Sequence, residues 1–412
     1  MNYAESVQYL YSLGNEVLTA KLGLERITRL LDSIGDPHRT CRFVHVAGTN
    51  GKGSTCAMIE AGLRAAGIRT GLYISPHLVE PTERIQMDGR PVSQEQFASA
   101  FALVHEKAEQ MLAAGEIDMH PTYFETVTAM AFVLFADTKL DMVVLEVGLG
   151  GRLDATNVVI PELCVITPID YDHQIFLGDT IEQIAAEKAG ILKRDVPAVF
   201  AAQRREAEAV LRAQARAKYT LSHEWPITNL AMDRRGSRFH LGGLDARVDV
   251  VCPLAGEHQV ENARVAAIAL AQLGVSPAGI AGARWPARLE RVSERPEIII
   301  DGAHNPAGTR ALAAYIGRFY SGRRIWMIYG ALRDKAVAEM TSILFPLADR
   351  IILTAPANSR AIPPEDIPAP EACITHSIAE AIALLEGAEP DDIIFIAGSL
   401  YLAGEARALL VK

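Results

Sequence analysis

The segment His45–Thr55 has the residue types and spacing of a phosphate-binding loop. Its sequence, HVAGTNGKGST, follows an apolar run typical of a buried strand and precedes a helical pattern. Glycines let backbone N–H groups close around an anion, and a helix N-terminus adds partial positive charge. Lys52 can reach the β- and γ-phosphates, and a hydroxyl after it can bind phosphate or Mg²⁺. The glycines are Gly48, Gly51 and Gly53, and the hydroxyl residues are Ser54 and Thr55.

This loop departs from the common pattern G-x-x-x-x-G-K-[ST]. Val46 stands five residues before Gly51, and Gly53 separates Lys52 from the hydroxyl residues. A turn tightened for packing alone would explain the glycines, but it needs neither the lysine nor the hydroxyl pair. The sequence therefore predicts nucleotide binding. The expected contacts are Asn50, Gly51, Lys52, Gly53, Ser54 and Thr55.

Glu146 is the ionisable residue of the apolar run Met142–Val147 and lies near its carboxyl end. A buried carboxylate is costly unless it is paired or binds a metal, and the carboxyl ends of parallel strands face the ligand crevice. Because Mg²⁺ prefers hard oxygen ligands, Glu146 is a candidate for Mg²⁺. By themselves, His173 and Lys188 would be a loop histidine and an exposed helix lysine.

The elements that must position these residues alternate between strands and helices. Strands are predicted at 42–47, 69–74 and 142–147, and helices at about 55–66 and 123–136, with a long polar loop through Pro91. Two S/T-x-x-Q capping boxes, at Ser93 and Thr180, open further helices. The alternation indicates an α/β fold, a P-loop-type domain with a mostly parallel sheet.

The second half of the chain changes character twice. Residues 219–252 have short alternating segments and turn signals, which predicts a β-hairpin region edging the first domain. The stretch 282–296 contains two prolines and several charges without an apolar period, so we expect a linker at 284–295. We therefore expect a domain at 1–283 and a smaller, Rossmann-like α/β domain at 296–412. Its predicted strands are 297–301, 325–329, 350–354 and 392–397, with helices from Pro306, after Lys335 and at the end of the chain.

Composition narrows the class of protein. With 40 Lys+Arg against 50 Asp+Glu, the net charge of -10 disfavours a general nucleic-acid binder, which would need a basic excess. No apolar run approaches the roughly 20 residues of a membrane helix, and the first residues do not resemble a secretory signal. The five scattered cysteines are not spaced as a zinc site or a disulfide framework. We expect a two-domain cytoplasmic protein with reduced thiols and no membrane or nucleic-acid partner.

Several motifs, in order, resemble the folylpolyglutamate synthases and bifunctional dihydrofolate synthases, which are Mur-ligase-like, ATP-dependent amide ligases. The resemblance spans almost the whole chain, from LGLER at 22–26 to GSLYLAGE at 398–405. Between them stand AGTNGKGS at 47–54, SPHL at 75–78, ERI at 83–85 and GLGGRLDATN at 148–157. This resemblance implies a larger ATP-binding and substrate domain and a C-terminal glutamate-ligase domain, with the nucleotide in an interdomain cleft.

The resemblance also implies roles for individual residues. It assigns Mg²⁺ to Ser75 and Glu146, a second Mg²⁺ to His173, and a CO₂-derived carbamate (N6-carboxylysine) to Lys188. Catalytic roles fall to Lys52, Lys188 and His304. The implied nucleotide contacts outside the loop are Asn262, Arg288 and Asp301. The implied pterin pocket is Leu22, Thr122, Phe124, Leu153, Asp154 and Ala155.

The activity implied is addition of L-glutamate to dihydropteroate, to tetrahydrofolate-type folates, or to both, through an acyl phosphate made from ATP. The expected cofactor is Mg²⁺ at two sites. The resemblance also makes a monovalent-cation site plausible, and we expect a monomer. Two alternatives stay open: a ligase of the same superfamily acting on another carboxylate, and a nucleotide-regulated P-loop binding protein. The latter would leave Glu146, His173, Lys188 and the second domain unexplained.

Overall fold

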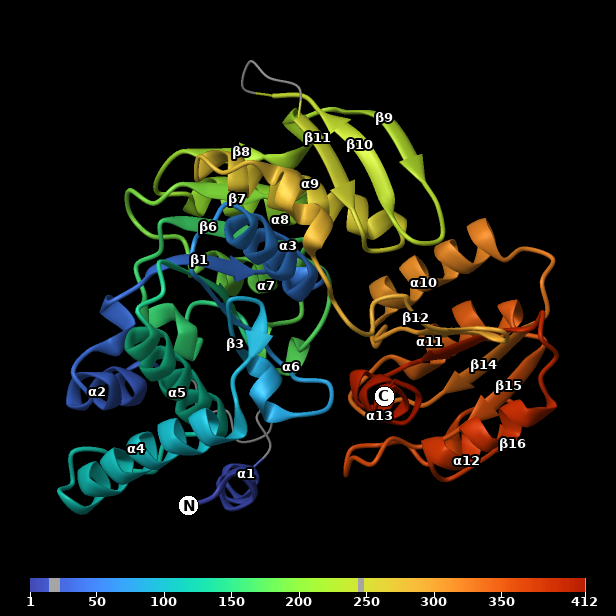
Figure 1. The fold of residues 1–412 in the computed structure, drawn as a ribbon, viewed down its shortest axis with the longest axis horizontal. Helices are drawn as coiled ribbons and strands as arrows, with labels where there is room; N and C mark the ends of the chain where they lie inside the picture. The colour runs from blue at the N-terminus through green and yellow to red at the C-terminus, as the bar shows by residue number, and fades with distance from the viewer. Residues whose placement is uncertain (15–22, 244–247, 412) are drawn as a thin grey trace. The chain divides into compact units, whose positions relative to one another are not determined.

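The computed structural model describes residues 1–14, 23–243 and 248–411, and the chain forms two compact units (Figure 1). Unit 1 comprises Met1–Asn229, Phe239–Val251 and Glu261–Ala283. Unit 2 comprises Leu230–Arg238, Cys252–Val260 and Arg284–Lys412. Because short segments from the middle of the chain group with unit 2, the division is not a single cut along the sequence.

Unit 1 is built on an eight-stranded sheet in the order β4-β3-β2-β5-β1-β6-β7-β8. The pairs from β2 through β8 are parallel, whereas β2–β3 and β3–β4 are antiparallel. The central strands are apolar because helices cover parallel sheets on both faces. The strands are β1 (Arg42–Ala47), β2 (Thr70–Tyr73), β3 (Ile85–Met87), β4 (Arg90–Pro91), β5 (Met142–Glu146), β6 (Leu163–Ile166), β7 (Ala198–Phe200) and β8 (Tyr219–Leu221).

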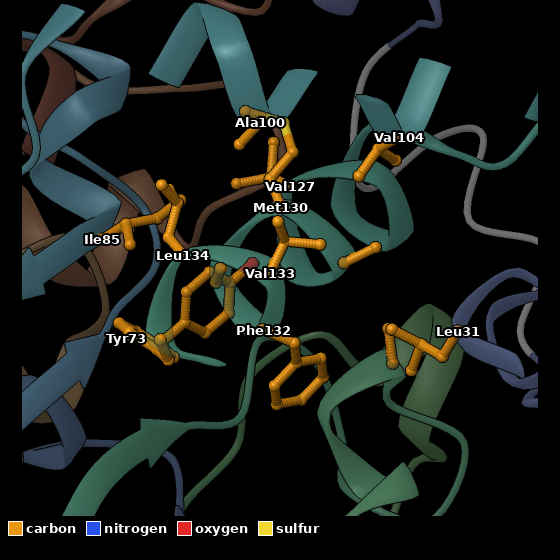
Figure 2. Close-up of a cluster of buried hydrophobic side chains, with 14 of the residues drawn as sticks. Leu31, Tyr73, Ile85, Ala100, Val104, Val127, Met130, Phe132, Val133 and Leu134 are labelled. Atoms are coloured by element: carbon orange, nitrogen blue, oxygen red, sulfur yellow. The ribbon is translucent and has the colours of Figure 1, made fainter. Parts of the chain in front are cut away.

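The helices of unit 1 close two apolar clusters. One cluster joins β2 and β5 to α2, α4 and α5, and Figure 2 shows Val127 and Met130 of α5 beside Ala100 of α4. The other cluster packs α7 and α8 on β6 and β7. The helices are α1 (Tyr3–Ser12), α2 (Glu25–Ser33), α3 (Lys52–Ala65), α4 (Gln94–Ala113), α5 (Tyr123–Thr138), α6 (Gln174–Leu177), α7 (Ile181–Ala189) and α8 (Arg205–Gln214). Helix α9 (Glu257–Gln272) begins with residues of unit 2 and continues with residues of unit 1 from Glu261.

Unit 2 contains a six-stranded sheet in the order β12-β13-β17-β14-β15-β16. Only the β12–β13 pair is antiparallel. Its strands are β12 (Glu290–Glu294), β13 (Glu297–Ile300), β14 (Ile325–Tyr329), β15 (Arg350–Leu353), β16 (Cys373–Ile374) and β17 (Ile393–Ala397). Its helices are α10 (Pro306–Phe319), α11 (Val337–Leu344), α12 (Ile378–Ala383) and α13 (Leu400–Leu410).

The α/β fold class predicted from the sequence is confirmed, and so are both capping boxes, since Ser93 caps α4 and Thr180 caps α7. The first helix after the loop begins at Lys52, three residues earlier than expected. The polar loop before Pro91 contains two short strands, β3 and β4, which add an antiparallel edge.

Two other regions differ from the expectation. The predicted hairpin region supplies β8 to the main sheet and a separate sheet, in the order β11-β10-β9, from β9 (Ile227–Met232), β10 (Ser237–Leu241) and β11 (Val248–Cys252). The stretch 284–295, expected as a linker, contains β12, whose polar sequence suits an edge strand. Among the described residues, no helix is long and apolar enough to cross a membrane. All five cysteines are free thiols.

Candidate active site

The loop between β1 and α3 adopts a backbone that requires glycine at two positions. Gly48 has a φ of +147°, and a Cβ there would lie 1.9 Å from Oγ1 of Thr167. Gly51, the N-cap of α3, has a φ of +83°, and a Cβ there would lie 2.2 Å from Oδ1 of Asn262. Both distances are far below van der Waals contact, so the loop can approach its neighbours only without side chains. The structure thus brings Asn262 of α9 against the loop, as a shared nucleotide site requires.

The segment after β6 holds this loop in place. The N–H groups of Thr49 and Asn50 both donate to the carbonyl oxygen of Pro168, at 3.0 and 3.2 Å. The Thr49 hydroxyl donates to the carbonyl oxygen of Asp170 and accepts from its N–H. The loop is therefore fixed at the carboxyl ends of β1 and β6, where the first turn of α3 presents N–H groups without an intrahelical acceptor. In that turn, Ser54 and Thr55 are buried, and Gly53 is partly exposed.

Lys52 and Glu146 form the charged centre of the site. The Nζ of Lys52 lies 4.0 Å from Oε1 of Glu146, and the carboxylate is almost completely buried. The N–H of Ser75, on the segment after β2, faces the other carboxylate oxygen at 3.4 Å. The strand order places β2, β5 and β1 side by side, so three neighbouring strand ends deliver Ser75, Glu146 and the loop to one place.

Lys188, near the end of α7, is buried and not exposed as its sequence pattern alone suggested. Its Nζ donates to the carbonyl oxygen of Gly48 at 2.8 Å. Burial, together with the nearby charge of Lys52, lowers the pKa of Lys188 to about 7, against the opposing charges of Asp172 and Asp154. The amine therefore loses its proton easily beside the phosphate loop.

The segment 148–157 packs against the end of α7 and so positions Lys188. The N–H of Arg152 donates to the carbonyl oxygen of Glu187 at 2.8 Å, and its guanidinium pairs with the Glu187 carboxylate at 2.9 Å. A Cβ at Gly151 would lie 2.9 Å from the carbonyl oxygen of Lys188, so the close approach requires glycine there. The segment 148–157 therefore packs against α7, whether or not it also contacts the substrate.

His173 lies at the start of α6 with a φ of +51°. Its N–H donates to Oδ1 of Asp172 at 2.9 Å, and its Nε2 lies 3.9 Å from the same oxygen. Asp172 also raises the pKa of Lys188 through its charge. Asp172 was missed in the sequence, where the only signal was its place next to the candidate histidine.

Phe124 and the segment after β5 meet, as the predicted pterin pocket requires. A Cβ at Gly148 would lie 2.5 Å from the Phe124 ring, and the Tyr73 ring centroid is 6.0 Å away. Phe124 is partly buried, at the edge of the apolar cluster of α4 and α5. Its ring thus has one packed side and remains partly exposed.

Thr122, another predicted pocket residue, has clear structural contacts. The hydroxyl of Thr122 accepts from the N–H of Glu125, and the Glu125 carboxylate accepts from the N–H of Thr122 in a capping box at α5. Glu125 also forms a buried ion pair with Arg26 of α2 at 2.8 Å. Thr122 therefore fixes the direction of α5 and with it the place of Phe124.

Asp154 is buried and hydrogen-bonded within its own loop. Its Oδ2 accepts from the N–H of Leu149 at 2.8 Å, and its Oδ1 accepts from the N–H and hydroxyl of Thr156. The same hydroxyl contacts Nε2 of His45 at 2.8 Å. Burial raises the pKa of Asp154. In this structure Asp154 shapes the loop; beside it, Leu153 is partly exposed and Ala155 buried, and Leu22 lies outside the described residues.

Apart from Ser75, sequence reasoning left the residues of SPHL and ERI without roles. In the structure, Nε of Arg84 donates to Nδ1 of His77 at 2.8 Å, and its guanidinium lies over the ring of Tyr123, 5.1 Å from the centroid. The buried Arg84 stands next to the chain segment that carries Phe124. A charged residue directly before the buried Ile85 of β3 was the available signal.

In unit 2, the Asp301 carboxylate after β13 holds the loop that carries Arg288. The Oδ2 of Asp301 accepts from the N–H of Leu289 and its Oδ1 from the N–H of Ala303, both at 2.9 Å. The charge of Arg288 lowers the pKa of Asp301, but burial outweighs it and the net shift is upward. Nη1 of Arg288 donates to the Ala287 carbonyl oxygen, and Nδ1 of His304 lies 2.8 Å from that of Gly302.

Comparisons with known proteins give the family context. The family model of the Mur ligase middle domain matches residues 46–271, and that of the Mur ligase glutamate ligase domain matches residues 287–400. The chain is 36% identical to a folylpolyglutamate synthase of Lacticaseibacillus casei, over 100% of this chain and 99% of that protein. It is 36% identical to the dihydrofolate synthase/folylpolyglutamate synthase of Bacillus subtilis, over 95% of each.

Solved structures agree with these sequence matches. Mycobacterium tuberculosis folylpolyglutamate synthase complexed with ADP and AMPPCP superposes with a TM-score of 0.90 at 34% identity, over 100% of this chain and 99% of that one. Escherichia coli FolC in complex with DHPP and ADP superposes with a TM-score of 0.88 at 30% identity, over 99% and 97%. The likeness therefore covers both units and the loop described above.

Proposed function

Since the chain belongs to the Mur ligase family, we propose that it is an ATP-dependent ligase that adds L-glutamate to dihydropteroate, to tetrahydrofolate-type folates, or to both. The observation that carries this proposal is the placement of Lys52 and Glu146 at the mouth of a glycine-dependent loop, 4.0 Å apart. A cation, a helix N-terminus and a buried carboxylate at one sheet edge suit a nucleoside triphosphate. The relatives solved with ADP, AMPPCP or DHPP support the same ligands.

The chemistry begins with a poor electrophile, the carboxylate of the pterin substrate. One of its oxygens attacks the γ-phosphorus of ATP, the bond to the ADP oxygen breaks, and an acyl phosphate forms. The amine of glutamate then attacks the acyl carbon, loses a proton and expels phosphate. Lys52 and the N–H groups at the start of α3 stabilise the charge on the transferring phosphoryl group.

The residues around Glu146 fit a magnesium ion. Glu146 supplies a buried carboxylate and Ser75 a hydroxyl at the adjoining strand end, which are hard oxygen donors of the kind Mg²⁺ prefers. We assign the first Mg²⁺ to these two residues and the second to His173. When bound, the metal would neutralise charge on the phosphate oxygens.

We also assign a carbamate to Lys188. Its amine is buried, hydrogen-bonded to the Gly48 carbonyl oxygen and easily deprotonated, and the neutral amine is the form that attacks CO₂. The new N–C bond would convert the side chain into an anion with loss of one proton. Intact mass spectrometry under non-denaturing conditions, with and without bicarbonate, would detect the adduct; its absence in both would contradict the assignment.

The remaining predicted residues complete the proposed site. Phe124 would stack on the pterin ring, because one side of its ring is packed and it remains partly exposed. Thr122 and Asp154 would shape the pocket through the contacts described above, with Leu153 and Ala155 beside them. Arg288 and His304 would contact the nucleotide, and Asp301 would hold the turn that carries Arg288. We expect a monomer that acts in the cytoplasm, and a monovalent-cation site remains a prediction.

The decisive experiment is phosphate release from ATP with L-glutamate and either dihydropteroate or tetrahydrofolate. We expect turnover that depends on both glutamate and acceptor, with the glutamylated product seen by mass spectrometry. Activity with one acceptor alone would define a monofunctional enzyme. Nucleotide binding without turnover on either acceptor would contradict the proposed folate substrate. It would favour a ligase that acts on another carboxylate, or a nucleotide-regulated binding protein.

A further inference from the structure

A second cluster of metal-ligating groups lies in unit 1, away from the residues assigned to the ligase. It consists of His105 and Glu109, one turn apart on α4, and of His120, which precedes α5. Nδ1 of His105 lies 3.9 Å from Oε1 of Glu109, and Nε2 of His120 lies 3.5 Å from the same oxygen. The three ligand atoms all lie within 4.8 Å of one another.

The two imidazole nitrogens are buried, and neither makes a hydrogen bond within the part of the chain that the structure describes. The other nitrogen of His120, Nδ1, is 2.9 Å from the carbonyl oxygen of Pro121 and must donate to it. In the neutral ring, this leaves a lone pair on Nε2, directed at Glu109. Burial lowers the pKa of His105, which also favours the neutral ring that binds metal.

Neighbouring rings hold the histidines in these orientations. The His105 ring stacks on Phe101 with centroids 5.3 Å apart and packs on Tyr9 of α1 at 4.5 Å. The Tyr9 hydroxyl donates to Oε1 of Glu109 at 3.4 Å. A hydroxyl donor to a ligating carboxylate and packing around the imidazoles are the outer contacts that metal sites use.

We propose that His105, Glu109 and His120 bind one Zn²⁺. Two imidazoles and one carboxylate are a common zinc ligand set, with a water in the fourth position. Ligands at ~2.0–2.1 Å from a tetrahedral ion lie about 3.3 Å apart, so the cluster needs only small side-chain adjustments. Mg²⁺ would not select it, because Mg²⁺ prefers oxygen ligands.

The site would tie α4 to the segment that leads into Thr122 and Phe124. Because His105 and Glu109 come from one helix and His120 from beyond it, the metal would close the 114–121 connection. Its expected effect is on the stability of this region and not on the ligation chemistry. The proposal therefore does not depend on the proposed function.

The test measures Zn²⁺ binding to the chelator-treated full chain by equilibrium dialysis in excess Mg²⁺, with metal analysis. We expect one equivalent more in the wild type than in a His105→Asn/His120→Asn variant, and at least ~10-fold weaker binding for Glu109→Gln. The matched control is His376→Asn, since His376 lies 3.6 Å from Glu365 in a pair with one histidine only. That variant should bind as the wild type does.

Two further measurements cover variants that fold poorly. Co²⁺ added to the wild-type protein should give the intense visible absorption of a tetrahedral ion, quenched by one equivalent of Zn²⁺. Zn²⁺ should also raise the Tm of the wild type and of His376→Asn, but not of Glu109→Gln, whose carboxylate is half exposed. Equal Zn²⁺ stoichiometry in the wild type and the double variant, or a Co²⁺ spectrum without tetrahedral features, would overturn the proposal.

Discussion

Both units place a cationic side chain beside a carboxylate at the end of a strand. In unit 1, Lys52 lies 4.0 Å from Glu146, the last residue of β5. In unit 2, Arg288 interacts with the charge of Asp301, which directly follows β13. Each unit thus has a pair of opposite charges at the carboxyl end of one of its strands.

The two carboxylates are held differently. Both oxygens of Asp301 accept short hydrogen bonds from backbone N–H groups at 2.9 Å, whereas the backbone N–H facing Glu146 lies 3.4 Å away. The loops differ as well. Left-handed positions are glycines at Gly48 and Gly51 but non-glycine residues at Ala287 and Leu289. In unit 2 the Asp301 carboxylate therefore holds a turn with two left-handed non-glycine residues, whereas in unit 1 glycines occupy the left-handed positions.

The largest effect should come from Lys52. Lys52→Ala removes the cation that we propose faces the transferring phosphoryl group, so kcat should fall by about 10²–10³-fold or more, with the fold intact. Phosphate release and thermal unfolding measure the two quantities. The exposed Lys218→Ala is the control, and a near-normal kcat for Lys52→Ala would remove Lys52 from the mechanism.

Asp301→Asn and Glu146→Gln should separate stability from chemistry. Asp301→Asn replaces one acceptor of two buried N–H groups and should cost about 1–3 kcal/mol in the free energy of unfolding. Glu146→Gln should alter the Mg²⁺ dependence of kcat, with a smaller effect on stability. Urea unfolding measures the stability of both variants, and Mg²⁺ titrations measure the Mg²⁺ dependence of their kcat. A larger loss of stability in Glu146→Gln, with a changed Mg²⁺ dependence in Asp301→Asn, would contradict the contrast between the two units.

Lys188 should make the stability of unit 1 depend on pH. Its pKa is lowered to about 7, while in the unfolded chain it stays near 10.4, so the unfolded state binds more protons between these values. The free energy of unfolding of the wild type should therefore rise with pH from 7 to 10, relative to Lys188→Met, by up to about 1.4 kcal/mol per pH unit.

Urea unfolding in CO₂-free buffer at three pH values would measure this slope. The exposed Lys218→Met should run parallel to the wild type throughout. Parallel lines for Lys188→Met as well would show that Lys188 keeps an ordinary pKa in the folded protein.

The smallest effect should come from Ala287→Gly. A left-handed residue with a Cβ costs about 1–2 kcal/mol, while glycine loses about 0.5–1 kcal/mol through chain entropy and the buried Ala287 methyl contributes about 0.8 kcal/mol, so stability should change by less than about 1 kcal/mol. The opposite exchange, Gly48→Ala, should destabilise unit 1, because its Cβ would meet Thr167. Thermal unfolding compares them, and a loss of more than about 1 kcal/mol in Ala287→Gly would show that the turn is not strained.

The sequence predicted those elements whose signals are local. Strands β1 and β5 are apolar runs because both of their faces are covered. The capping boxes at Ser93 and Thr180 mark the starts of two helices. Strand β12 was missed because its polar residues, ERVSE, suit an edge that lacks an apolar period.

Functional residues were harder to predict where long-range contacts define them. The hydrogen bond of Lys188 to Gly48 joins residues 140 positions apart, so nothing near Lys188 in the sequence reveals its burial. The family resemblance supplied Lys188 and His173, and residue chemistry alone supplied Lys52 and Glu146. The backbone contacts of Asp154 and Asp301 depend on the loop conformation, which the sequence pattern does not encode.

The capping box of α5 has a consequence for protein engineering. Thr122 and Glu125 fix the helix start, and Glu125 also pairs with Arg26 at 2.8 Å. A library that randomises the whole segment TYFE to change acceptor preference would therefore lose most members to misfolding. Randomising Phe124 alone, with Thr122 and Glu125 kept, leaves the helix start intact. Such a library varies only the side chain that we propose to stack on the pterin ring.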